Sequence, residues 1–378
     1  NHPQTVWKIV LFLPVFCPTI GAHLKRSRMI YSGDTVFPNI YNDNILGNCD
    51  KKFLEKQKIV NLESLITLES CKKITTGIGL HSSKDIIKFL KDLNVVSISQ
   101  ANNHITDFNT SINKQKEFLK DNNIESFGAG DTIDIAQKAF FYEENRIEYG
   151  VISFGWEVIS CKAATQTSKG VNPLRYKNVV FQAQEFIKKH PTKKLIIIFH
   201  WDYEFELYPQ PAHRQLAFEL IDMGVNAIIG HHPHIVQGFE VYKNKPIFYS
   251  LGNFYFPDAN YNGYEMSYSE DAKNGLCVEL SEDVRDIVLY WTYLSDNEKL
   301  LIIKKENLFE SEKLKELSSF SGMEHEKYID WFKSNRKKNK ALPIYKVVDS
   351  RVETFLKDRF VIYRQVFINF LVCLGVKK

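Results

Sequence analysis

The chain has 378 residues, of which 44% are apolar and 25% are charged, as is ordinary for a folded globular protein. This length accommodates one large domain with an appendage, or two modest domains. Its 49 basic and 45 acidic residues leave a net charge of only +4, which gives no bulk attraction for a polyanion. The six cysteines are scattered without CxxC spacing. This pattern argues against a zinc-thiolate site or a disulfide framework and fits a reducing compartment.

The N-terminal segment, residues 1–28, contains a short apolar run at 9–20. The run is too short to span a membrane as a helix, and it carries two prolines. Lys8 precedes it, as in a signal-peptide core, but the small-residue cleavage pattern after it is poor. We therefore expect a buried or edge strand here, with a targeting remnant as the alternative.

From residue 29 onward, short apolar runs alternate with segments of helical periodicity. The runs that predict strands lie at 29–32, 58–62, 95–99, 147–153, 195–199, 225–229 and 246–250. Helices are predicted at 83–93 and 111–122, and one amphipathic helix separates the strands at 195–199 and 225–229. This alternation indicates a layered α/β sandwich.

The pattern changes after Gly275. Residues 276–280 and 286–293 predict an antiparallel strand pair, and from about residue 305 the chain is rich in Lys and Glu and helical in pattern. We therefore expect a main domain at 29–300 and a helical C-terminal region at 301–378. The apolar stretch 360–376 predicts an amphipathic or docking helix and leaves a membrane-surface role open.

Polar side chains recur where the predicted strands end, at Asp34, Glu63, Asn103-His104, His200 and the cluster Gly230–His234. In an α/β sheet, ligands bind beyond the carboxyl ends of the strands. Two parallel strands joined by a crossover helix lie close together, so their terminal histidines are expected side by side. Oxygen and nitrogen donors without cysteine suit borderline or hard divalent ions. The sequence therefore predicts a metal centre at this edge.

Seven short motifs occur in a fixed order: Gly33-Asp34, Asn61-Leu62-Glu63, Ala101-Asn102-Asn103-His104 with Asp107, Gly128-Ala129-Gly130, His200-Trp201 with Glu204, Gly230 to His234, and Ser250-Leu251-Gly252-Asn253-Phe254. Together they resemble the CapA family of capsule and poly-γ-glutamate synthesis proteins, a divergent branch of the calcineurin-like metallophosphoesterases. The resemblance covers roughly residues 29–256. Two departures are Asn109 and Asp202, at positions where the family usually has glycine. Asp202 is expected to add a side chain beside the predicted site.

The resemblance implies a fold and a cofactor. The fold is a four-layer αββα sandwich of the metallophosphoesterase type with a C-terminal helical appendage, and the cofactor is a pair of divalent metal ions such as Mn, Fe or Zn. The implied ligands form two sets joined by Glu63, which would bridge: Asp34 and His234 for one ion, and Asn103, His200 and His232 for the other.

The resemblance also implies roles around the metals. His104 would be the general acid or transition-state donor, and Asp107 and Glu204 would orient imidazoles. His231 would orient its turn through a hydrogen bond. The residues expected on the substrate side are Asn102, His231, Arg214, Ser250 and Asn253.

Taken singly, several of these residues are also consistent with purely structural roles. A lone strand-end histidine such as His200 is more often a hydrogen-bonded structural residue, and Glu63 fits a helix cap. His104 and Asn102 fit turn positions, and Ser-Leu-Gly-Asn is itself a good turn. Gly128 and Gly130 fit a tight turn better than an anion cradle. Arg214 fits a bidentate anion ligand and, equally, a solvated helix arginine.

The function that the resemblance implies is a metal-dependent phosphoesterase-like enzyme of bacterial capsule or surface-polymer biosynthesis, in which a metal-activated hydroxide attacks a phosphoester. The alternative is a catalytically inactive polymer-binding or assembly subunit of a capsule synthesis complex. The expected partners are a surface polymer or its phosphorylated precursor and such a complex, with peripheral membrane contact left open. No nucleic-acid partner is expected, because no basic, aromatic groove is evident. The expected location is a bacterial cytoplasm or membrane surface.

Overall fold

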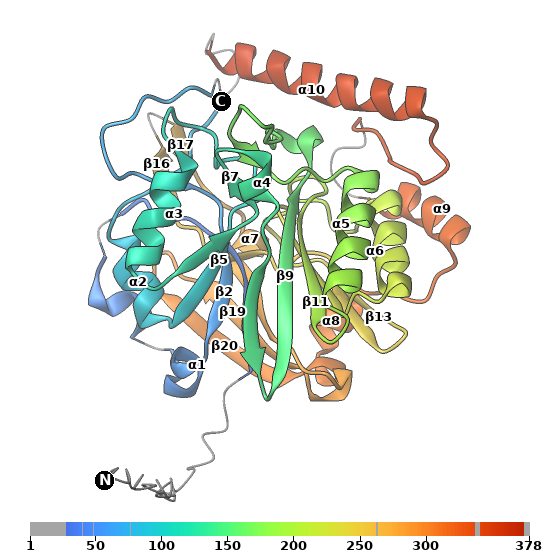
Figure 1. Ribbon diagram of the computed structural model, residues 1–378, viewed down its shortest axis with the longest axis horizontal. Coiled ribbons are helices and arrows are strands. Elements are labelled where there is room, and N and C mark those ends of the chain that lie inside the picture. The colour runs from blue at the N-terminus through green and yellow to red at the C-terminus, as the bar shows by residue number, and fades with distance from the viewer. Residues whose placement is uncertain are drawn as a thin grey trace, which may run out of the picture.

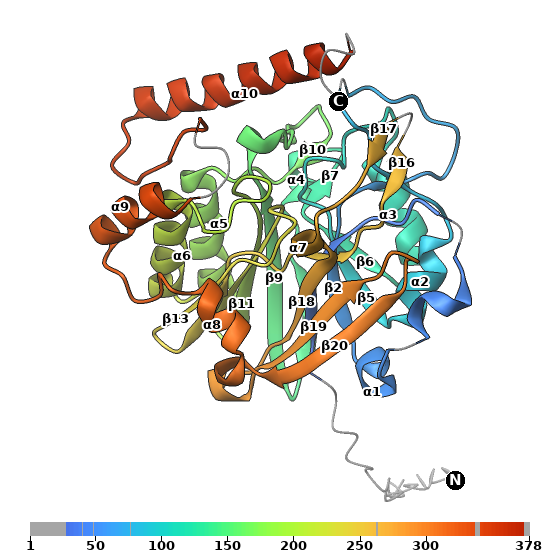
Figure 2. The same cartoon turned by 180° about the vertical axis from the view of Figure 1, so that it is seen from behind.

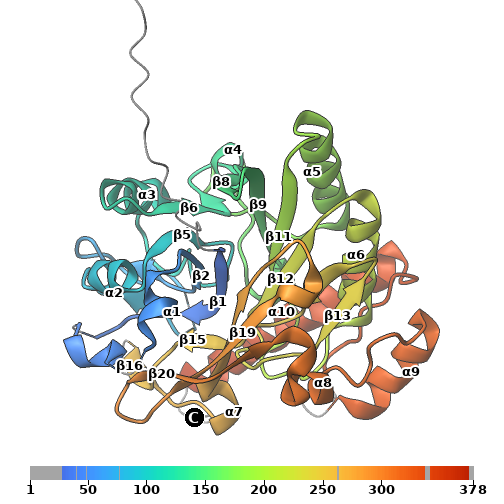
Figure 3. The same cartoon turned by 90° about the horizontal axis from the view of Figure 1, so that it is seen from below.

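The computed structural model describes residues 28–39, 41–47, 49–75, 77–261, 264–336 and 341–373. The strand or targeting remnant expected at 9–20 lies outside these residues. Within them, two β-sheets lie face to face and helices cover their outer sides (Figures 1 and 3). This arrangement confirms the predicted four-layer αββα sandwich with C-terminal helices.

The first sheet has eight strands in the order β20-β19-β18-β1-β2-β5-β6, with β15 pairing beside β1. Their bounds are β1 (Ile30–Thr35), β2 (Lys58–Leu62), β5 (Val95–Ser99), β6 (Glu125–Phe127), β15 (Asn253–Tyr255), β18 (Asn274–Glu279), β19 (Val288–Leu294) and β20 (Leu300–Asn307). The strands β1, β2, β5 and β6 are parallel, and β18, β19 and β20 continue the sheet in antiparallel pairs.

The antiparallel part of this sheet is longer than predicted. The predicted pair at 276–280 and 286–293 is confirmed as β18 and β19. The strand β20, which the sequence analysis did not predict, carries the sheet to Asn307. The helical pattern expected from about residue 305 therefore begins only after this strand.

The second sheet has the order β13-β14-β12-β11-β9-β8. Its strands are β8 (Phe140–Glu144), β9 (Ile147–Gly155), β11 (Lys194–His200), β12 (Ala227–His231), β13 (Phe239–Tyr242) and β14 (Lys245–Phe248). The four strands β9, β11, β12 and β14 are parallel. In the β11–β12 pair His200 lies opposite His231, so the two strands deliver their imidazoles side by side, as predicted.

The strand predicted at 246–250 is confirmed as β14, and a second strand that was not predicted follows it in the other sheet. β14 ends at Phe248 in the second sheet, and β15 begins at Asn253 in the first. The chain crosses between them through Gly252, whose φ of +65° favours glycine. This crossing passes very close to Gly33 of β1. A Cβ at position 33 would lie only 2.0 Å from the carbonyl oxygen of Gly252.

Helices cover the outer face of each sheet. α2 (Ile86–Asp92) and α3 (Ile112–Asp121) lie outside the first sheet, and α5 (Tyr176–Lys189) and α6 (Pro211–Met223) lie outside the second (Figure 3). The first two confirm the helices predicted at 83–93 and 111–122. The shorter helical elements are η1 (Asp43–Leu46), α1 (Lys51–Glu55), α4 (Ile133–Ala136), η2 (Glu157–Ile159), α7 (Glu270–Lys273), η3 (Val284–Asp286) and η4 (Leu308–Glu310).

Three apolar layers hold these elements together. Side chains of both sheets, such as Tyr31 and Ile196, form the core between them. A second cluster joins α2 and α3 to the first sheet, and a third joins α5 and α6 to the second. Small two-stranded sheets complete the loops: β3 (Leu65–Ile66) with β4 (His81–Ser82), β7 (Ala129–Gly130) with β10 (Gly170–Val171), and β16 (Ala259–Tyr261) with β17 (Tyr264–Met266).

The C-terminal region is helical and packs on the second sheet's side of the molecule. It contains α8 (Glu312–Leu317), α9 (His325–Asn335) and α10 (Arg351–Cys373). Tyr328 and Phe332 of α9 join the core that covers α6. α10 lies across one end of the molecule (Figures 1 and 2). Among the helices of the described ranges, none is long and apolar enough to cross a membrane.

Candidate metal centre

The two sheets deliver different donors to one point. Asp34 lies on β1 opposite Asn61 of β2, and Glu63 directly follows β2. His200 and His231 end their strands in the other sheet. Carboxylates from the first sheet therefore meet imidazoles from the second at the carboxyl edge of both.

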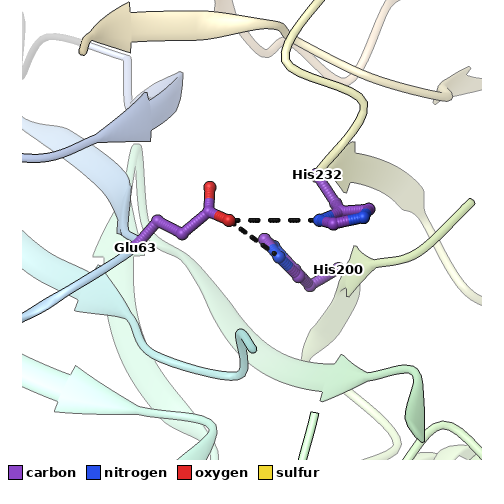
Figure 4. Close-up of side chains that lie close together, drawn as sticks. All are labelled: Glu63, His200 and His232. Atoms are coloured by element: carbon purple, nitrogen blue, oxygen red, sulfur yellow. Dashed lines mark ion pairs between the residues drawn. The ribbon is translucent and has the colours of Figure 1, made fainter. Parts of the chain in front are cut away.

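Glu63 belongs to two groups of buried donors, and Figure 4 shows the group that it forms with His200 and His232. One group is Glu63, His200 and His232; the other is Asp34, Glu63 and His234, and within each group the candidate ligand atoms lie within 4.8 Å of one another. Oε1 of Glu63 is 3.4 Å from Nε2 of His200, 3.9 Å from Nδ1 of His232 and 3.7 Å from Nε2 of His234. A carboxylate shared by two donor sets is suited to bridging two ions.

One further side chain, Asn103, joins these groups, and Asp34 makes additional contacts. Oδ1 of Asn103 lies 2.7 Å from Nε2 of His200, which puts its amide oxygen on the His200 side. Oδ2 of Asp34 lies 3.6 Å from Nδ1 of His234 and accepts a hydrogen bond from the backbone N–H of His232 at 3.1 Å. The structure thus brings together all six residues predicted as metal ligands.

Several buried polar atoms in this centre have no hydrogen-bond partner among the described residues. They are both carboxylate oxygens of Glu63, Oδ1 of Asn61, and the Nδ1 atoms of His231 and His232. Leaving such groups buried and unpaired costs free energy, so their clustering indicates a ligand that the protein itself does not supply. Oxygen and nitrogen donors without thiolate fit divalent ions such as Mn, Fe or Zn. The residues therefore fit the implied metals.

The two carboxylates differ in their electrostatic environment. Burial raises the pKa of Glu63 to about 8, and the charge of Asp34 adds to this effect while His234 opposes it. Burial would also raise the pKa of Asp34, but the surrounding imidazoles, first that of His231, hold this pKa well below its usual range. A cation beside Glu63 would offset the cost of its buried charge.

The imidazoles of His200 and His232 are held in the form that binds metal. Burial lowers the pKa of His200 to about 4, although the charge of Asp34 opposes this effect. Burial, reinforced by the neighbouring imidazoles, also lowers the pKa of His232 well below its ordinary value. Neutral imidazoles keep a lone pair free for a metal.

The His-Pro-His turn aims two of these rings. His232 and His234 have φ values of +96° and +57°, in the left-handed region that residues other than glycine rarely adopt. Such conformations cost about 1–3 kcal/mol each and persist where the surrounding structure imposes them. Here Oδ1 of Asn253 lies 2.9 Å from Nδ1 of His234 and fixes its ring. Asn253 thus contacts a predicted ligand.

His104 lies at the more open side of the centre, with 17% of its side chain exposed. Its Nδ1 is 2.7 Å from Oδ2 of Asp107, and this oxygen also accepts from the backbone N–H of Leu80 at 3.0 Å. Burial would lower the pKa of His104, but Asp107, with Glu63 and Glu204 at longer range, raises it to about 9. At neutral pH this ring is therefore protonated on both nitrogens and positively charged, and it lies beside the metal donors.

Two predicted substrate residues hydrogen-bond to the backbone of nearby turns within the described part of the chain. Nδ2 of Asn102 donates to the carbonyl of Leu62 at 2.7 Å, and its Oδ1 accepts from the backbone N–H groups of His104 and Ile105. Oγ of Ser250 donates to the carbonyl of Ile235 at 2.8 Å. Both therefore shape the turns that carry other site residues.

His231 and Glu204 flank the centre. Nδ1 of His231 is 3.3 Å from Oδ1 of Asp34, so this ring lies against a predicted ligand, on the buried side. Glu204 is exposed, and its charge raises the pKa of His104 and opposes the lowering of that of His200. Glu204 therefore lies near the rings of His104 and His200, at the exposed rim of the centre.

The expectation that Asp202 lies beside the site is wrong. Its side chain is buried, and Oδ1 accepts from the backbone N–H of Gln210 at 3.0 Å and lies 2.6 Å from Nδ1 of His213. With a φ of +64°, Asp202 starts the loop that follows β11 and pins that loop to α6. The carboxylate is thus a loop anchor.

The structure corrects both interpretations of Arg214. This side chain is only 1% exposed, so it is not a solvated helix arginine. Its Nε and Nη2 atoms each donate to Glu240 at 2.7 Å, and Nη2 also donates to the carbonyl of Met323. These donors are committed to an ion pair beneath the C-terminal region, so Arg214 does not line the metal centre.

Asn61 contacts two predicted ligands, although it was not among the residues predicted for the site. Its Nδ2 donates to Oδ1 of Asp34 at 2.7 Å and lies 3.3 Å from Nδ1 of His200. A signal existed, because Asn61 and Glu63 are two residues apart at the end of one strand, where alternate side chains point the same way.

Comparison with known proteins identifies the family. The family profile described as "Bacterial capsule synthesis protein PGA_cap" matches residues 32–258, more than half of the chain. The chain belongs to this family. The predicted resemblance is thereby confirmed, and with it the membership of the metallophosphoesterase-like superfamily.

Three curated relatives agree with this placement in the capsule synthesis family. "Capsule biosynthesis protein CapA" of Bacillus anthracis is 27% identical over 246 residues, which cover 63% of this chain and 57% of that protein. "PGA biosynthesis protein CapA" of Bacillus subtilis (strain 168) is 34% identical over 202 residues, 52% of each chain. A "Probable polyglutamine synthesis accessory protein" of Mycobacterium tuberculosis is 27% identical over 222 residues, 56% of this chain and 58% of that one. The chain spans little more than half the length of these relatives.

Proposed function

We propose that this protein is a metal-dependent phosphoesterase-like hydrolase that acts in the synthesis of a bacterial capsule or another surface polymer. The observation that carries the proposal is the position of Glu63, which belongs to both buried donor sets and has no protein donor on either oxygen among the described residues. The names of the family and of its relatives support the polymer-synthesis setting.

The side chains of the centre would have different roles. Glu63 would bridge two ions, with Asp34 and His234 on one side and His200, His232 and Asn103 on the other. Two divalent ions bound there would supply positive charge that polarises a phosphoryl oxygen and lowers the pKa of water. The protein adds the buried, neutral imidazoles of His200 and His232.

His104 supplies the proton. Because Asp107 holds Nδ1, the proton on Nε2 is left for the leaving oxygen of a phosphoester. The charge of Glu204 at the rim favours the protonated ring. The same carboxylate would repel a second negative charge, which favours a phosphodiester over a dianionic phosphomonoester.

Hydrolysis of bis(p-nitrophenyl) phosphate by protein loaded with Mn²⁺ tests the proposal. We expect turnover in the wild type and a loss of about 100-fold or more in His232→Ala, which lacks a ligand. His190→Ala removes a histidine at the end of α5, outside the centre, and should keep full activity. Protein that binds metal but hydrolyses no phosphoester would contradict the enzyme and favour a polymer-binding subunit.

A further inference from the structure

α10 turns an apolar face to solvent. Eight large apolar side chains of this helix are each between 50% and 66% exposed: Val352, Phe355, Leu356, Phe360, Tyr363, Val366, Phe367 and Phe370. Soluble proteins rarely expose a contiguous apolar surface of this kind without a partner. Val347 and Val348, just before the helix, are exposed as well.

These side chains form one continuous stripe. With 3.6 residues per turn, the eight positions fall within an arc of about 140°. Arg359 is the only charged residue of α10 within that arc, and its guanidinium lies 5.1 Å from the ring of Phe355. The stripe runs the length of the 23-residue helix, about 35 Å.

Specific contacts fix the helix so that this stripe faces outward. On the opposite face of α10, Val361 is buried in the apolar cluster that joins α5 and α6 to the second sheet. Nζ of Lys357 donates to Asp349 at 2.5 Å and to the carbonyl of Ile344 at 2.9 Å, while Asp358 accepts from the hydroxyl of Tyr345 at 2.8 Å. The polar side of α10 thus binds the protein and its apolar side is left outside.

We propose that the α10 stripe docks on the surface of a lipid bilayer that contains anionic headgroups. The arc is wider than the narrow seam of a two-helix coiled coil, which argues against a second copy of the same helix as the occupant. Five of its eight side chains are aromatic, as is typical of helices that lie in the interface of a membrane.

Charge complementarity points to the same occupant. The charged residues in the stripe or along its edges are Arg351, Arg359 and Arg364 against a single acidic residue, Glu353. Basic residues beside an inserted apolar face add electrostatic attraction to anionic lipids.

Docking would place the metal centre near the membrane. α10 contacts η2, which follows the carboxyl end of β9, and the N–H of Trp156 at that end donates to the carbonyl of His200 at 3.0 Å. The helix therefore lies at the edge of the sheet where the imidazoles gather (Figure 1). The consequence that the substrate is a phosphoester held at the membrane surface rests on the proposed function; the docking itself does not.

Vesicle flotation tests the docking. The full chain is mixed with vesicles of three parts phosphatidylcholine to one part phosphatidylglycerol, and the floating fraction is measured. We expect the wild type to float with these vesicles and Phe360→Ser/Phe367→Ser to bind at least about tenfold more weakly, because two buried aromatic anchors are lost. The matched control Phe181→Ser/Ile303→Ser, at residues 62% and 52% exposed on α5 and β20, should float like the wild type.

Two results would overturn the docking. One is wild-type protein that does not float. The other is a dimer in vesicle-free solution that the Phe360→Ser/Phe367→Ser variant converts to monomer, because the stripe would then be a contact between copies. Metal content and hydrolysis of a soluble phosphodiester are measured on the same samples, so a failure of the docking and a failure of the proposed function can be told apart.

Discussion

The amide of Asn61 joins the two sheets at the candidate metal centre, since its Nδ2 lies 2.7 Å from Oδ1 of Asp34 and 3.3 Å from Nδ1 of His200. Asp34 comes from the first sheet and His200 from the second. Asn61 therefore sets the distance and orientation of two predicted ligands without being one of them. Partners of this kind fix ligand geometry and tune metal affinity.

Replacing Asn61 with Ala should weaken metal binding by about 10–100-fold while all the ligands remain. Competition with a chelator of known affinity measures this change. Asn226→Ala is the matched control, because Oδ1 of Asn226 accepts from the backbone N–H of Leu195 at the start of β11, away from the centre. Equal metal affinities in the two variants would refute the orienting role of Asn61.

Removing the imidazole of His104 should separate turnover from metal binding. His104→Gln should keep the metals and lose about 10²–10⁴-fold in the rate of phosphodiester hydrolysis, since the proton donor is gone. Asp107→Asn should show a smaller loss of rate, because an amide still accepts from Leu80 but no longer favours the charged ring. A His104→Gln variant as fast as the wild type would exclude the general-acid role.

Breaking the ion pair of Arg214 and Glu240 should destabilise the fold without changing activity. Arg214→Met leaves Glu240, 3% exposed, without its cation and should lower the free energy of unfolding by about 3–5 kcal/mol. Arg214→Met/Glu240→Leu should recover most of that loss, because the uncompensated charge is gone too. Urea unfolding measures both variants. A substrate role for Arg214 would instead predict unchanged stability with lost activity.

Glu206 should make stability depend on pH. This carboxyl is buried in the loop after β11, and burial raises its pKa to about 7 although Arg336 opposes the shift. Unfolded, the group titrates near its ordinary value of about 4.3. The folded state therefore binds more protons between these values, so the contribution of Glu206 is fully present below about pH 4.3 and is lost as pH rises towards 7.

The comparison with Glu206→Gln isolates this effect. The free energy of unfolding of the wild type, relative to the variant, should fall by at most about 3 kcal/mol between pH 4.5 and pH 7. Unfolding by urea at several pH values measures the difference. A difference between the two proteins that does not change with pH would show that Glu206 titrates normally.

The sequence was sufficient to predict that polar side chains gather at one edge of the sheets, because several of them follow or end a strand. Apolar runs bounded by Asp34, Glu63 and His200 identified the strands, and parallel strands with a crossover helix bring their carboxyl ends together. The two layers of helices followed from the alternation of strand and helix patterns. Local patterns thus predicted a layered α/β sandwich, and the resemblance to the CapA family specified the four αββα layers that the structure confirms.

Contacts between distant segments could not be predicted in this way. Arg214 is buried by contacts with Met323 and Glu240, and no residue near Arg214 in the sequence indicates this burial. Asp202 turns towards His213 because of its backbone conformation, which its residue type does not reveal. The polar contacts that turn the apolar side of α10 outward, such as that of Asp358 with Tyr345, are likewise visible only in the structure.

The metal content per chain, determined by inductively coupled plasma mass spectrometry on protein purified without chelator, would decide whether the two donor groups hold ions. With Glu63 shared between both donor sets, we expect about two equivalents of manganese, iron or zinc in the wild type and a clear loss in Glu63→Gln, accompanied by a lower melting temperature. Wild-type protein that holds no metal, even after incubation with these ions, would contradict the two-ion centre around Glu63.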